Sequence, residues 1–154
     1  KGIWQAMPDD DKRLWENGPV VDFKPINMGE APTNNRWPDG KTSADKFFNL
    51  KAEAWWCLRC RFERTYEYVN ATESQKEDPA WQAEHRIEDL ISIPNHAQLI
   101  AELSIVKVEY TDKGKVKVES KKQLRQRGIK SPDFAEALVL LFCPKRRELR
   151  AWVL

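Results

Sequence analysis

The stretch GKVKVESKKQLRQRGIKSPDFAEALVLLF, residues 114–142, decides the fold, because it joins one strand pattern to two helix patterns. Valine alternates with lysine and predicts a strand over 115–119. Ser120 is expected to cap a short basic helix, KKQLRQRG, that Gly128 ends. Ser131 is expected to cap the last helix, with Pro132 at its first position, where a missing N–H has no cost.

Two acids, Asp133 and Glu136, stand three residues apart at the start of this last helix and therefore share one face. Acids in a first turn stabilise the helix dipole by about 0.3–1 kcal/mol and need no other role. Alternatively, hard divalent cations bind carboxylate oxygens on a rigid element, and a basic segment that could hold phosphates precedes this helix. The residues alone leave both interpretations open.

The composition predicts one globular domain over residues 1–154, with 41% hydrophobic and 32% charged residues. No apolar run approaches the roughly 20 residues of a membrane helix, and the first residues do not resemble a signal peptide. Because the chain does not begin with Met, we expect it to be a piece of a longer protein. Cys57 and Cys60 form a CxxC, but they lie in a helical pattern without a second ligand pair, which favours reduced thiols over a zinc site.

Positive charge is concentrated near the C-terminus. Residues 107–154 hold 13 Lys or Arg against 6 Asp or Glu, whereas residues 1–106 hold 13 against 18. This asymmetry indicates a polyanionic partner such as nucleic acid, with a merely solvated lysine face as the alternative. The candidate contacts to phosphates are Lys113, Lys115, Lys117, Lys121, Lys122, Arg125 and Arg127.

A long helix is predicted over 44–69, where apolar residues recur at threes and fours and Ser43 or Asp45 can provide the N-cap. Trp55 and Trp56 in this helix are expected to pack into the core rather than stack on bases. Strands over 104–110 and 115–119 should form a hairpin with Gly114 at a position of positive φ.

The remaining segments have weaker patterns. The predictions are short helical pieces at 3–7 and 12–16, a strand over 20–26, a functional or mobile loop over 27–43, a mobile excursion over 70–86, a strand or turn within 87–94, and a helix over 95–104 with Asn95 as N-cap.

Three segments together, FFNLKAEAWWCLRCRFERTY (47–66), EDLISIP (88–94) and the stretch 114–142, resemble the C-terminal nuclease domain of tailed-phage terminase large subunits. These proteins cut concatemeric DNA and pump it into the capsid. The resemblance covers roughly residues 18–143 and includes the ending "ESK…RG-KSPD" in order and at natural spacing.

The resemblance implies an α/β, ribonuclease H-like mixed sheet flanked by helices, with carboxylates that gather two Mg²⁺ or Mn²⁺ ions. Asp133 stands where the family has a metal ligand. Glu136 stands where the family pattern has Asp, which suggests a ligand or a water-mediated role. The implied function is a DNA endonuclease with a two-metal mechanism. The implied partners are double-stranded DNA, the terminase small subunit and the portal. The implied location is the cytoplasm of a bacterial host, on the procapsid and not in the mature virion.

The chain departs from the family pattern at its N-terminal side. The family's other two metal-binding acids lie on earlier strands, which we expect to precede Lys1. Asp9, Asp10 and Asp11 are interpreted as a solvated loop, and Asp22 as a weak substitute. An incomplete sheet with exposed edges would favour self-association and weak or no cleavage by this chain alone. The rival hypothesis is a DNA-binding or assembly module, or a prophage remnant, without chemistry of its own.

Overall fold

The structure is a computed structural model that describes residues 25–144. Its elements, in chain order, are α3 (Ser43–Lys46), α4 (Leu50–Asn70), α5 (Glu73–Glu77), α6 (Pro79–Glu84), a 3₁₀ helix η1 (Ile87–Asp89), α7 (Ala97–Ile105), β1 (Val108–Tyr110), β2 (Val116–Val118), α8 (Lys121–Gln126) and α9 (Asp133–Leu141). The helical pieces predicted at 3–7 and 12–16 lie outside the described residues, as does most of the strand predicted over 20–26.

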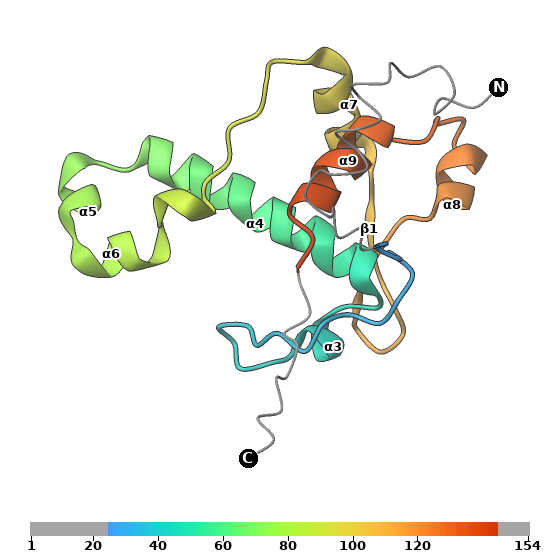
Figure 1. Ribbon diagram of the computed structural model, residues 1–154, viewed down its shortest axis with the longest axis horizontal. Helices are drawn as coiled ribbons and strands as arrows, with labels where there is room; N and C mark the ends of the chain where they lie inside the picture. The colour runs from blue at the N-terminus through green and yellow to red at the C-terminus, as the bar shows by residue number, and fades with distance from the viewer. Residues whose placement is uncertain (1–24, 145–154) are drawn as a thin grey trace, which may run out of the picture.

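Helix α4 runs through the length of the structure, and the other elements lie along it (Figure 1). At one end of the molecule α7, α8, α9 and the hairpin gather around it, and at the other end α5 and α6 fold back beside its last turns. Ala52 on α4 packs with Val116 and Val118 of β2, whereas Leu58 on α4 packs with Ile91 and with Val139 of α9. The one helix therefore joins the sheet to α9. Trp55 and Trp56 pack against these clusters, which confirms their predicted role in packing.

The helix predicted over 44–69 is divided, which corrects the prediction. Phe47 leaves the helical conformation, forms a parallel bridge with Val116 and is completely buried. Asn49 then caps α4 by accepting a hydrogen bond from the N–H of Ala52 at 3.0 Å. The N-cap of the short helix α3 is Thr42 instead of the predicted Ser43 or Asp45, and Asp45 is the N3 residue of its capping box.

The predicted hairpin is confirmed, with strands shorter than expected. β1 and β2 are antiparallel with Val108 opposite Val118 and Tyr110 opposite Val116, and Gly114 has a φ of 72°. Within the described residues the sheet has these two strands, extended by the bridge at Phe47.

Residues 70–86, predicted as a mobile excursion without a regular pattern, contain two short helices. These are α5, with a capping box from Thr72, and α6, with Pro79 at its first turn. Residues 87–89 form η1, and residues 90–94 contain no strand. The N-cap of α7 is His96 rather than Asn95, because its ring nitrogen accepts the N–H of Leu99.

The C-terminal elements largely follow the prediction. Ser120 and Gln123 form a capping box at the start of α8, and Gly128, with a φ of 74°, follows the helix. Ser131 does not cap α9. The first helical hydrogen bond runs from the N–H of Glu136 to the carbonyl of Pro132, so the helix starts one residue later than predicted. None of the helices between residues 25 and 144 combines the length and apolar character needed to cross a bilayer.

Candidate functional site

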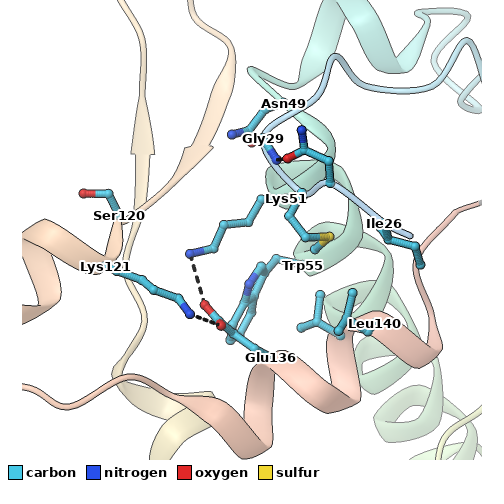
Figure 2. Close-up of a pocket in the computed structure, with 12 residues that line it drawn as sticks. Ile26, Gly29, Asn49, Lys51, Trp55, Ser120, Lys121, Glu136 and Leu140 are labelled. Carbon is cyan, nitrogen blue, oxygen red and sulfur yellow. Dashed lines mark hydrogen bonds and ion pairs between the residues drawn. The ribbon is translucent and has the colours of Figure 1, made fainter. Parts of the chain in front are cut away.

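The two acids of α9 have different surroundings. The side chain of Asp133 is exposed, and within residues 25–144 no hydrogen bond or ion pair involves its carboxylate. Glu136 is half-buried and lies between two lysines (Figure 2). Its Oε2 is 2.8 Å from Nζ of Lys121, and its Oε1 is 3.6 Å from Nζ of Lys51. Asp133 is thus the acid with a free carboxylate.

Glu136 forms part of a pocket of about 450 Å³ between α4, α8, α9 and the segment at 26–29. Lys51, Trp55 and Asn49 line it from α4 and its N-cap. Figure 2 shows Lys51, Lys121 and Glu136 converging at one end of this pocket, with Leu140 and Ile26 at the other. The pocket has a charged end and an apolar end.

Each element that lines the pocket is held by specific contacts. Lys51 Nζ also donates to the carbonyl of Glu119 at 3.2 Å, which links the first turn of α4 to the end of β2. The N–H of Ala135 donates to Glu102 of α7 at 3.0 Å and fixes the first turn of α9. The capping box at Ser120 orients α8, so that Lys121 lies directly at the pocket.

Glu119 forms a structural junction behind the pocket. It is 3% exposed and pairs with the guanidinium group of Arg127, and it also accepts the N–H of Lys107 at 3.3 Å. The hydrogen bond from Arg127, supported by the Lys107 N–H, holds the pKa of Glu119 below its usual value. This ionised carboxylate therefore joins the hairpin to α8.

Six of the seven predicted phosphate contacts, all but Lys121, fall into two groups. Lys115 donates to the carbonyl of Ala44 at 2.7 Å, Lys117 pairs with Glu109 at 3.6 Å, and Arg127 is bound to Glu119, so these three have structural partners. The exposed members without an ion-pair partner among the described residues are Lys113, Lys122 and Arg125.

The predicted basic residues line two different hollows. Lys121 belongs to the pocket with Glu136. Lys113 and Lys115 instead line a separate hollow at the hairpin turn, together with Phe48, Thr111 and Asp112.

The described residues alone do not form a complete metal site. No group of three or more His, Cys, Asp or Glu side chains that could hold a metal ion occurs between residues 25 and 144. Cys57 and Cys60 are free thiols on α4. Burial, with the nearby charge of Glu53, raises the pKa of Cys57 to about 12, so its thiolate is scarce at neutral pH.

Sequence reasoning missed Lys51, although it lies within the KAEAWW motif that carries the resemblance. In a helix with an apolar periodicity, a single lysine gives no signal that it faces a pocket rather than solvent. Lys51 is identified only by the short distance in the folded structure between its ammonium group and the carboxylate of Glu136.

No protein-family model matches the sequence, and no curated protein matches it either. The structure, however, is similar to solved structures of the nuclease domain of the large terminase subunit gp2 of bacterial virus Sf6. One has 26% identity and a TM-score of 0.62, and covers 78% of this chain and 53% of that chain. A lysine-to-alanine variant with calcium has 26% identity and a TM-score of 0.61, covering 77% and 52%.

A third structure is a lysine-to-alanine variant with manganese and beta-thujaplicinol. It has 22% identity and a TM-score of 0.67, and covers 94% of this chain and 63% of that chain. At this identity the similarity supports the fold and no shared activity. This chain spans about half the length of the first solved domains it matches. The structure therefore confirms that this chain resembles the nuclease domain of a tailed-phage terminase large subunit, and that its fold is of the ribonuclease H-like α/β class.

Proposed function

We propose that this chain is part of a metal-dependent DNA endonuclease that cuts concatemeric phage or prophage DNA during packaging. The observation that carries the proposal is the structural similarity to a terminase nuclease domain over 78% of the chain at 26% identity. The free carboxylate of Asp133 at the first turn of α9 supports it, because a metal ligand must be available to the ion.

In this proposal Asp133 binds Mg²⁺ or Mn²⁺, and Glu136 is the second candidate ligand. Related solved domains hold manganese or calcium, which supports a divalent-cation site of this kind. Because both oxygens of Glu136 face lysines, a water-mediated role suits it better than direct coordination. Because no group of three or more possible metal ligands gathers among the described residues, the remaining ligands of a two-ion site would come from outside them. Two such ions, when bound, activate water and stabilise the leaving oxygen of a phosphodiester.

The proposed substrate is double-stranded DNA, held through its backbone. A nuclease without strict sequence preference needs contacts to phosphates more than to bases. The exposed cations Lys113, Lys122 and Arg125 are available for this role. The terminase small subunit, the portal and the bacterial cytoplasm are the partners and place that follow from the same proposal. When this chain is alone, pairing between the exposed β1 edges of two copies would extend the incomplete sheet.

A second candidate function is a DNA-binding or assembly module without chemistry. It is favoured by one observation, that no three metal-ligating side chains gather within the described residues. Cleavage separates the two candidates, whereas DNA binding does not.

The test is cleavage of supercoiled plasmid in Mn²⁺, comparing this chain with a longer polypeptide that continues upstream. The proposed endonuclease predicts cleavage by the longer polypeptide, abolished by EDTA, and weak or no cleavage by the 154-residue chain. A longer polypeptide that binds the plasmid but never cuts it in Mn²⁺ would establish the second candidate instead.

A further inference from the structure

The pocket between α4, α8 and α9 holds an excess of positive charge at one end. Two ammonium groups, those of Lys51 and Lys121, face the single carboxylate of Glu136. The side chain of Lys51 is only 16% exposed, whereas that of Lys121, at the mouth of the pocket, is 52% exposed. An anion that enters the pocket would therefore meet one uncompensated positive charge in a partly desolvated place, where Coulomb attraction exceeds its value in water.

The two lysines also have unused hydrogen-bond donors. Each ammonium group carries three N–H bonds. Lys51 donates one of them to the carbonyl of Glu119, and its ammonium group is 3.6 Å from Glu136, an ion pair without a hydrogen bond. The ammonium group of Lys121 forms its ion pair with Glu136 at 2.8 Å. Donors therefore stay available on both ammonium groups, and a phosphate oxygen accepts such donors readily.

The pocket also has the size and position for a backbone phosphate. Its volume of about 450 Å³ lies in the range of small-ligand sites. Glu136 is one helical turn from Asp133, the acid that we propose as a metal ligand, so a phosphate bound by the lysines would lie beside that position.

We propose that Lys51 and Lys121 together bind one backbone phosphate of DNA in this pocket. Glu136 holds the two ammonium groups side by side in the free protein, and the phosphate shares them on binding. The identification of the polyanion as DNA rests on the proposed function. Lys51 is then a substrate-binding residue, contributed by α4 rather than by the basic C-terminal third.

The test measures binding of a short fluorescent DNA duplex to the 154-residue chain in EDTA, as a function of salt concentration. Metal and cleavage play no part in this measurement. Lys51→Gln and Lys121→Gln should each reduce the slope of log K against log salt by about 0.9, the value for one phosphate contact. The double variant should reduce it no further, because in each single variant Glu136 already neutralises the lysine that is left, and the contact with the shared phosphate is lost.

Two variants serve as controls. Lys76→Gln removes a lysine of α5 that pairs with Glu73, far from the pocket, and should leave the slope unchanged (Figure 1). Lys51→Arg keeps the charge and should retain most of the binding, which separates loss of charge from loss of folding. Circular dichroism spectra and thermal unfolding are recorded for every variant.

Slopes that stay at the wild-type value in both single variants, with native spectra, would overturn the shared subsite. A double variant that loses twice the slope of each single variant would also overturn it, because it would indicate two independent contacts. A wild-type chain without salt-dependent DNA binding would overturn the proposed function as well.

Discussion

Glu53 of α4 accepts hydrogen bonds from both the backbone N–H and the hydroxyl group of Thr33, at 2.7 and 2.5 Å, although the two residues are 20 positions apart. Ser43 donates a third hydrogen bond to the same carboxylate at 2.7 Å. All three side chains are at most 1% exposed. This buried carboxylate fixes the segment before α3 onto α4, and the beginning of that segment forms one wall of the pocket.

Replacing Glu53 by Gln should lower the free energy of unfolding by about 1–3 kcal/mol. The three donors now bind two carboxylate oxygens, whereas the amide of glutamine has one acceptor oxygen. Urea unfolding followed by circular dichroism measures the change. Glu63→Gln is the matched control, since Glu63 is on the same helix but 50% exposed and forms its one ion pair within residues 25–144 with Arg59. This control should change stability by less than about 0.5 kcal/mol. Equal losses in the two variants would contradict the structural role of Glu53.

Stability should fall in acid partly through Glu119. Its pKa in the folded state lies below the ordinary value of 4.5, chiefly because of the hydrogen bond from Arg127. The unfolded chain therefore binds more protons than the folded one between the two pKa values, so the contribution is present above about pH 4.5 and is lost as the pH falls through the folded pKa. Urea midpoints measured across this range should depend less on pH in Glu119→Gln than in the wild type. Parallel curves for the two proteins would exclude this contribution.

Cys57 should resist alkylation in the folded protein. With a pKa of about 12, against 9.0 for a free thiol, its thiolate fraction at pH 8 is about a thousandfold smaller than that of an exposed cysteine. Iodoacetamide labelling followed by peptide mass spectrometry should find Cys57 labelled quickly in urea and very slowly without it. Rapid labelling of the folded protein would show that the thiol is exposed or activated.

The basic residues should separate into DNA-binding and structural groups. Lys122→Gln and Arg125→Gln remove exposed cations and should each reduce the salt dependence of DNA binding by about 0.9, without loss of stability. Lys115→Gln removes the hydrogen bond to the carbonyl of Ala44 and should lower stability by about 1 kcal/mol. Duplex binding and urea unfolding, measured on the same three variants, test the division. The opposite pattern, with DNA binding lost only in Lys115→Gln, would contradict it.

Local signals in the sequence were sufficient for several elements. Gly114 adopts the predicted positive φ, and Ser120 caps α8 as predicted, because both depend only on residues within one turn. The resemblance indicated the fold class, since its motifs span α4 and the segment from β2 to α9.

Interactions between distant segments explain what the sequence could not predict. The apolar periodicity continues through Phe47, yet this residue pairs with Val116 in the sheet and divides the predicted helix. The segment 27–43 has the composition of a mobile loop, but the buried Glu53 holds it in place.

The candidate site shows the same division. Asp133 was identified from a motif, whereas Lys51 lies far from Glu136 in sequence and only the fold brings the two together. A pattern read along the chain contains no information about such a pair.

The most direct test of the account is the rate of plasmid cleavage in Mn²⁺ by the longer polypeptide with Asp133→Asn. Asp112→Asn, in the exposed turn of the hairpin, is the matched control for the loss of one negative charge. If Asp133 binds the metal, the Asp133 variant should lose cleavage by a factor of about 100 or more, because removing even an outer-shell partner of a metal ligand costs about 10–100-fold, while the Asp112 variant keeps it. If the Asp133 variant cuts as fast as the Asp112 variant, the acids of α9 serve only to stabilise the helix, and the metal site lies elsewhere.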